Sequence, residues 1–170
     1  MSRPIEHADK ANLFVRALAT VVDWLFRANG WILIALLTVM SVVMLIQVLS
    51  RYLFNAPLTW PEELGRYLFI WIVFLGAALA FRKRAHLRIE FISSKIKPSL
   101  MAVIEKVTEF IILIFLIFII YISIEVLTIT GSQKSPVLHI PMNYIYLAFP
   151  VASALMILDL ATRWLFPSSK

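Results

Sequence analysis

The chain contains four long stretches in which hydrophobic residues follow one another without a charged side chain. They extend over residues 28–50, 67–81, 110–124 and 140–158. At about 1.5 Å of rise per residue, a helix of roughly twenty residues crosses the ~30 Å hydrocarbon core of a bilayer. The shorter stretches reach that length once their flanking residues are included. The pattern therefore predicts four transmembrane helices, over about residues 29–50, 63–82, 107–130 and 141–164, with a kink at Pro150 in the last of them.

Two further segments are amphipathic rather than uniformly hydrophobic. In residues 11–28, hydrophobic side chains recur at helical spacing and polar ones take the opposite face. Residues 82–106 mix hydrophobic and basic positions and contain Lys97–Pro98–Ser99, where a helix should break. We expect helices lying in the membrane interface at both places. The predicted fold is thus an all-α integral membrane protein, a single membrane domain over 1–170 with four transmembrane helices. Amphipathic interfacial helices are expected at the N-terminus and between spans two and three.

Composition supports this class of protein. The chain is 61% hydrophobic and 15% charged, with a mean hydropathy of +0.88, whereas soluble domains are about 45–50% apolar and about 25% charged. Cysteine is absent, which excludes disulfides, thiolate metal sites and iron–sulfur clusters. The net charge is +6, but the basic residues flank the hydrophobic stretches instead of forming one polar face, so no nucleic-acid partner is expected.

The distribution of Lys and Arg predicts the orientation. Thirteen of the 16 lie in the two terminal segments and between the second and third stretches, and the alternate side has only Arg51, Arg66 and Lys134. By the positive-inside rule, both termini and the loop between spans two and three are expected in the cytoplasm.

Catalytic chemistry is not apparent in the sequence. The histidines, His7, His86 and His139, all lie in polar segments, and no His, Asp and Glu cluster has metal-ligand spacing. A glycine-rich phosphate loop is absent too. We therefore expect neither an enzyme nor a bound metal or cofactor.

Autonomous transport would require ionisable residues near the membrane midplane. The acidic residues instead lie near the ends of the stretches, where Asp159 and Arg163 are spaced to pair on one helix face. Glu125 is the one acid placed noticeably inside its span. It is either functional, or reaches toward the headgroups, or bonds to a neighbouring helix. This chain does not resemble a transport path.

The segment around the start of the second span is the most informative. Trp60 is placed as an aromatic belt residue, and Pro61, Glu62 and Glu63 are favourable for a helix N-terminus. Within the span, one face holds the small residues Gly76 and Ala80, which permit close approach of another helix. The other face holds Trp71, a tryptophan near mid-bilayer. Both faces indicate packing against neighbouring helices. The residues that share the first face are Glu62, Arg66, Phe69, Val73, Gly76 and Ala80.

These motifs together resemble a known family. Their order and spacing are similar to those of the small, DctQ-like membrane subunit of tripartite ATP-independent periplasmic (TRAP) transporters, with the sialic-acid type as one candidate. The motifs are Trp60-x-Glu62-Glu63, Arg66, Trp71, Phe74–Leu75–Gly76–Ala77 and the basic run through His86. The resemblance covers nearly the whole chain.

The resemblance implies a function. Such a small subunit packs against and anchors a large membrane subunit (M), which works as an elevator and holds the substrate and sodium sites. A periplasmic substrate-binding protein (P) delivers an organic acid of the C4-dicarboxylate, keto-acid or sialic-acid class. The small subunit itself would need no cofactor, because the sodium gradient is used by the complex.

Candidate functional residues follow from both arguments. Contact with phospholipid headgroups is expected at Arg82, Lys83, Arg84 and Arg88, and Glu125 is the candidate intramembrane acid. Two other functions stay open: a stand-alone small carrier, which would depend on Glu125, and a structural membrane anchor of another complex. Subunit contact is expected at Trp60, Glu62, Glu63, Arg66, Trp71, Gly76, Ala80 and His86.

Overall fold

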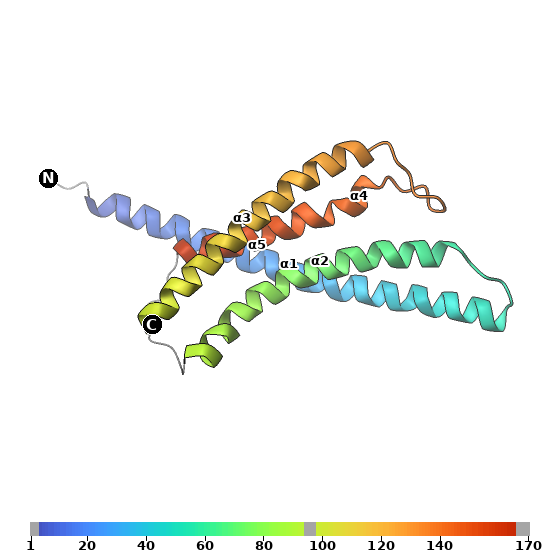
Figure 1. The fold of residues 1–170 in the computed structure, drawn as a ribbon, viewed down its shortest axis with the longest axis horizontal. Coiled ribbons are helices and arrows are strands. Elements are labelled where there is room, and N and C mark those ends of the chain that lie inside the picture. The colour runs from blue at the N-terminus through green and yellow to red at the C-terminus, as the bar shows by residue number, and fades with distance from the viewer. Residues whose placement is uncertain (1–3, 94–97, 166–170) are drawn as a thin grey trace.

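The computed structural model describes the backbone of residues 4–93 and 98–165, and the side chains of residues 18–83, 100–101 and 103–164. Within these residues the regular structure is helical, apart from one isolated bridge between Lys134 and Pro141. The helices are α1 (Pro4–Leu53), α2 (Trp60–Ser93), α3 (Pro98–Thr130), α4 (Asn143–Tyr146) and α5 (Ala148–Leu165), as Figure 1 shows.

Four segments are long and apolar enough to cross a membrane, which confirms the predicted all-helical fold with four spans. The fourth is made of α4 and α5 together. The segments are Leu18–Leu53, Trp60–Lys83, Val103–Thr130 and Asn143–Trp164.

The expected separate interfacial helices are continuous with the spans. Residues 11–28 belong to α1, which has 50 residues and is about 75 Å long, without a break near residue 28. Likewise α2 continues past Arg82 to Ser93. The sequence could not distinguish these cases, because amphipathic and apolar segments share one helical period and nothing between them stops a helix. The predicted break before span three agrees better, since α3 begins at Pro98, where proline is favourable in a first turn.

The kink expected at Pro150 appears one turn before it, as an interruption of the helix at Leu147 between α4 and α5. Proline has no N–H group to offer the carbonyl of Tyr146, so the regular ladder of hydrogen bonds fails at this point. The ladder resumes with the N–H of Val151, which donates to the carbonyl of Leu147 at 3.2 Å.

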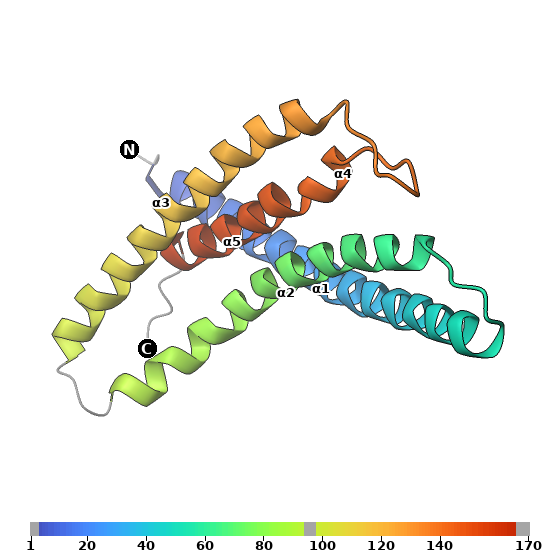
Figure 2. The ribbon, with the colours of Figure 1, turned by 45° about the vertical axis from the view of Figure 1, so that its right-hand side comes forward.

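The helices form two antiparallel pairs, α1 with α2 and α3 with α5, and α5 also packs against α2 (Figures 1 and 2). The loops over residues 54–59 and 131–142 lie at one end of the bundle, which we call the loop end. The opposite end, where α2 finishes and α3 begins, we call the far end. The buried hydrophobic residues are Val22, Phe26, Val43, Leu75, Ala78, Leu116, Ile145, Ala148, Ala152 and Leu160.

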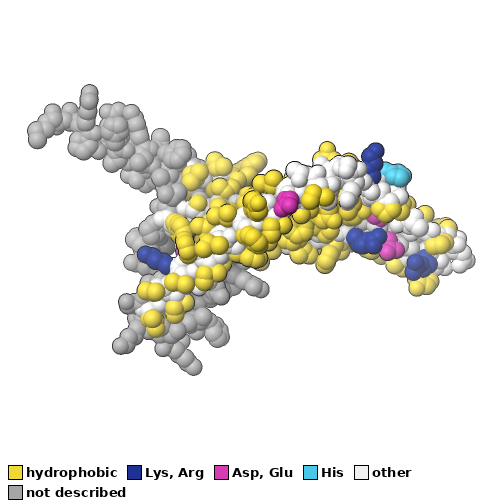
Figure 3. Space-filling model, turned by 45° about the horizontal axis from the view of Figure 1, so that its top comes forward, with side chains coloured by type: hydrophobic (Ala, Val, Ile, Leu, Met, Phe, Trp, Pro, Cys, Tyr) yellow, Lys and Arg dark blue, Asp and Glu magenta, His cyan; other side chains and the backbone are white. Residues whose placement is uncertain are grey.

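Much of the remaining hydrophobic surface is exposed. On α3, side chains such as Ile111, Phe115 and Tyr121 are more than half exposed, and α1 exposes Trp24 and Trp31. In Figure 3 a hydrophobic surface covers the middle of the bundle, and of the charged side chains that are described and visible on this face most lie toward the loop end. An apolar surface of this extent belongs in lipid or against other proteins.

Candidate functional site

Polar contacts join the helices at both ends of the bundle. At the loop end the central group is Glu63 in the first turn of α2, which is 2% exposed. Its carboxylate accepts hydrogen bonds from the hydroxyl of Tyr67 and from the backbone N–H of Val137, both at 2.8 Å. Glu63 thus fastens the loop over residues 131–142 onto the start of α2.

Ser135 completes this loop-end cluster, which consists of Glu63, Tyr67, Ser135 and Val137. Its hydroxyl bonds to Glu63 and accepts the N–H of Ile140 at 3.1 Å. Tyr67 also lies 3.8 Å from the sulfur of Met142. The proposed contact residue Glu63 is therefore occupied within its own chain.

Its neighbours on α2 are placed differently. Glu62 and Arg66 are exposed, and the structure shows no hydrogen bond or ion pair for either of them among the residues it describes. Trp60 is half-buried at the start of the helix. The face that holds Glu62 and Arg66 continues along the span with Phe69, 56% exposed, and Val73, 44% exposed.

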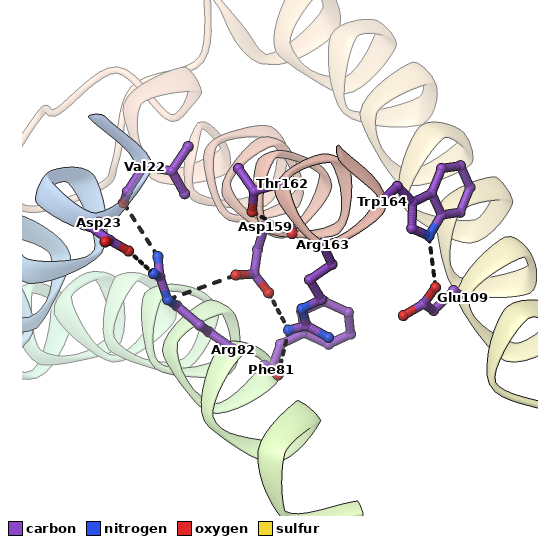
Figure 4. Close-up of polar contacts among 9 residues, drawn as sticks. All are labelled: Val22, Asp23, Phe81, Arg82, Glu109, Asp159, Thr162, Arg163 and Trp164. Carbon is purple, nitrogen blue, oxygen red and sulfur yellow. Dashed lines mark hydrogen bonds and ion pairs between the residues drawn. The ribbon is translucent and has the colours of Figure 1, made fainter. Parts of the chain in front are cut away.

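At the far end, Arg82 of α2 lies between two acids from other helices (Figure 4). It pairs with Asp23 of α1, and its Nε is 3.8 Å from Oδ1 of Asp159 in α5. Its guanidinium also donates to the carbonyl of Val22 at 3.4 Å and lies 4.4 Å from the ring centre of Phe26. Arg82 was expected to face lipid headgroups, but the structure places its charge against α1 and α5.

Arg163 extends the same network. It pairs with Asp159, as the spacing of four residues predicted, and this prediction is confirmed. It also donates to the carbonyl of Phe81 at 3.4 Å and lies 5.1 Å from the centre of the Phe81 ring. Asp159 is 4% exposed, so two arginines share one buried carboxylate.

A hydrogen bond between Trp164 and Glu109 connects α3 to this network. The indole N–H of Trp164 donates to the carboxylate of Glu109 at 2.7 Å. The far-end cluster, made of Asp23, Arg82, Glu109, Asp159, Arg163 and Trp164, therefore links all four spans (Figure 4). Sequence reasoning missed the pairings of Asp23 with Arg82 and of Glu109 with Trp164. The only available signal was that these residues lie near the same end of their helices.

Between the two clusters, close helix packing involves α1 and α2 of the same chain. A Cβ added at Gly76 would lie 3.8 Å from Leu33, an ordinary contact. At Gly65, which sequence analysis did not select, it would clash with Cε of Met44. Among the glycines, Gly65 leaves the least room for a Cβ, while Ala80 is exposed.

Three remaining candidates gain no partner from the structure. Glu125 is exposed on α3, and its side chain has no hydrogen-bond partner among the described residues. Its backbone carbonyl accepts a hydrogen bond from the hydroxyl of Thr128 at 2.7 Å. Lys83 is exposed beside Arg82. Trp71 is half-buried between α1 and α5, with no hydrogen bond from its indole to any described residue. The side chains of Arg84, His86 and Arg88 lie outside the described residues.

Metal-binding geometry is not found in the part of the chain with described side chains, where no three His, Asp or Glu residues come together. The polar contacts described above connect helices to one another. Two polar clusters on α2, at Glu63 and Arg82, are 19 residues or about 28 Å apart, close to the thickness of a hydrocarbon core. Both clusters hold helices in place.

Comparison with known proteins identifies the family. The family model described as "Tripartite ATP-independent periplasmic transporters, DctQ component" matches residues 40–166. A Haemophilus influenzae protein named as a TRAP transporter small permease protein is 33% identical over 149 residues, covering 88% of this chain and 91% of the relative. The sialic acid TRAP transporter small permease protein SiaQ of Vibrio cholerae is 35% identical over 65 residues, 38% of each chain.

A third relative is much longer than this chain. The sialic acid TRAP transporter permease protein SiaT of Haemophilus influenzae is 26% identical over 114 residues, which are 67% of this chain but only 18% of the relative. The family that the Trp60-x-Glu62-Glu63 motif indicated is thus confirmed, and it is a family of transporter subunits, not of enzymes. The chain is a multi-pass membrane protein that belongs to the DctQ component family of tripartite ATP-independent periplasmic transporters.

Proposed function

We propose that this chain is the accessory scaffold subunit of a sodium-coupled TRAP transporter. It packs against a large membrane subunit that holds the substrate and ion sites, and it keeps the static part of that subunit in place. A periplasmic binding protein delivers the substrate, an organic acid of the C4-dicarboxylate, keto-acid or sialic-acid class. The chain itself carries no cofactor.

The distribution of charge in the bundle is the observation that supports a scaffold. In α2 no charged residue lies between Arg66 and Arg82, and the other spans are uncharged over similar stretches. The two buried acids, Glu63 and Asp159, are already held by partners in the same chain. A carrier needs ionisable groups that meet substrate or ions near the midplane. This bundle instead uses its buried charge for bracing.

The length of SiaT supports the large partner. In that protein the sequence related to this chain makes up 18% of one longer permease polypeptide. In SiaT the related segment is covalently joined to the rest of the permease. A separate small subunit would have to bind its large partner non-covalently to form the same assembly.

Orientation completes the proposal. The loop end faces the periplasm and the far end faces the cytoplasm of a bacterial inner membrane, with both chain ends on the cytoplasmic side. The basic residues of the far end, including the exposed Lys83 together with Arg84 and Arg88, then lie where anionic lipid headgroups attract them.

The test is reconstitution. The chain is tagged, expressed with the proteins encoded beside it, and purified in mild detergent. We expect a stoichiometric partner of roughly a dozen spans, and sodium-gradient-driven uptake of an organic acid by proteoliposomes only when both chains and the binding protein are present. Uptake by this chain alone, or undiminished uptake by the partner without it, would overturn the proposal.

A further inference from the structure

A groove of about 480 Å³ opens between α1, α2 and α5 on one side of the bundle. Hydrophobic residues of all three helices line the groove, such as Ile32 of α1, Trp71 and Leu75 of α2, and Leu155 of α5. The groove lies on the opposite side of α2 from the exposed face that holds Phe69 and Val73, because Trp71 is about half a turn away from both. The two surfaces are therefore distinct.

A buried polar group lines this apolar groove without a full set of partners. Asn29 of α1 is 3% exposed, and its side-chain nitrogen donates to the carbonyl of Leu75 at 3.1 Å. Its side-chain oxygen is buried and accepts no hydrogen bond. Nearly all buried polar atoms in proteins are hydrogen-bonded, so this orphaned acceptor beside the groove lacks a donor, and an occupant of the groove supplies one once the enclosed Asn29 side chain turns toward it.

Trp71 adds the opposite functional group to the same groove. Its indole N–H has no partner among the described residues. Trp71 lies eight residues after Glu63 and eleven before Arg82, so the groove is near the middle of the membrane. Water cannot satisfy polar groups at that depth, and a lipid acyl chain has neither donor nor acceptor. The occupant must therefore carry a hydrogen-bond donor and an acceptor at this depth of the membrane.

We propose that a transmembrane helix of the large subunit occupies the α1–α2–α5 groove, with a hydroxyl or carboxamide side chain bonded to Asn29 and Trp71. Interhelical hydrogen bonds of this kind join membrane helices. The incoming helix would complete a four-helix arrangement with α1, α2 and α5. This inference rests on the proposed function and specifies the surface through which the two subunits meet.

Crosslinking in the assembled complex tests the location. A photoreactive amino acid is placed either at Ile32 in the groove or at Val73 on the other face. Both positions are exposed, Ile32 by 50% and Val73 by 44%. We expect ultraviolet light to join the Ile32 variant to the large subunit and the Val73 variant to lipid. If the complex co-purifies but Ile32 labels only lipid, or only Val73 reaches the large subunit, the groove proposal is wrong and the scaffold function stands. If no large subunit co-purifies, the proposed function itself fails.

Substitution tests the chemistry. Asn29→Leu removes the acceptor, together with the bond to the carbonyl of Leu75, and Trp71→Phe removes the donor; each should weaken the complex by about threefold to about twentyfold in dissociation constant. Thr38→Val is the control, because Thr38 bonds to the carbonyl of Ile34 in its own helix and lies about 180° around α1 from Asn29. Affinity that is unchanged by both groove substitutions, or equally reduced by the control, would overturn the assigned hydrogen bonds.

Discussion

Asp159 is the residue through which the far-end cluster can be tested most directly. The substitution Asp159→Asn keeps the shape of the side chain and removes its charge. Asp159 is 4% exposed and faces two guanidinium groups, those of Arg82 and Arg163. The variant therefore leaves two arginines beside a neutral amide that can accept fewer and weaker hydrogen bonds than a carboxylate.

The size of the effect follows from the surroundings. Removing one partner of a buried ion pair costs about 3–5 kcal/mol. The side chains of Arg82 and Arg163 are 28% and 27% exposed, and Arg82 keeps Asp23 as a second partner, so the lower end of about 3 kcal/mol applies. For a chain of this size, 1 kcal/mol corresponds to about 2–4 °C in Tm. We expect Asp159→Asn to lower the Tm by about 6–12 °C.

The assay is thermal unfolding of the purified chain in one detergent, followed by intrinsic tryptophan fluorescence. Glu125→Gln is the matched control, because it removes the same charge from an exposed position with no side-chain partner among the described residues. Its effect should stay within about 0.5 kcal/mol, or about 2 °C. If Asp159→Asn shifts the Tm no further than Glu125→Gln does, the far-end cluster does not brace the helices as described.

The sequence predicted the fold because hydrophobic length is a strong signal in membrane proteins. A chain in lipid must satisfy its backbone hydrogen bonds within helices, so an uninterrupted apolar stretch has few alternatives. The ends of the helices were harder to predict. Residues 11–28 have a helical pattern of their own, yet they join α1 without a break. Amphipathicity indicates a face, and it does not indicate where a helix must stop.

The contacts between helices were the least accessible to sequence reasoning. Asp159 and Arg163 could be paired from their spacing because both lie on one helix. Arg82 could be placed only at an end of its span, since its partners Asp23 and Asp159 lie 59 and 77 positions away in the chain. The same limit applies to Glu63, whose position suggested a helix start and whose partners in residues 135 and 137 depend on how the loop folds back.

The small residues of α2 show that two side chains on the same side of a helix need not contact the same neighbouring helix. Gly76 and Ala80 were selected because they share a side at a spacing of four. In the structure Gly76 lies beside Leu33 of α1 while Ala80 is exposed, so within this chain only Gly76 meets another helix, and contact of the pair with another subunit stays a prediction. A spacing of four residues places two side chains on one side of a helix, but neighbouring helices also determine which of them is covered.

The packing between α1 and α2 and the fastening of the outer loop each give a further prediction. Tyr67→Phe removes the hydroxyl that donates to Glu63 at 2.8 Å, so we expect a Tm lower by about 2–4 °C and faster proteolysis of the loop over residues 131–142; an unchanged cleavage rate would show that the hydroxyl does not hold the loop. Gly65→Val should weaken the complex or lower its yield more than Gly76→Val, because the added Cβ at Gly65 clashes with the end of the Met44 side chain, whereas the nearest atom to the one at Gly76 is 3.8 Å away. The comparison is made by size-exclusion chromatography and thermal unfolding of both variants. The end of a methionine side chain can move, so Gly65→Ala should be tolerated and only the branched residue should force α1 and α2 apart. Equal behaviour of the two valine variants would mean that Met44 does not restrict the space at Gly65.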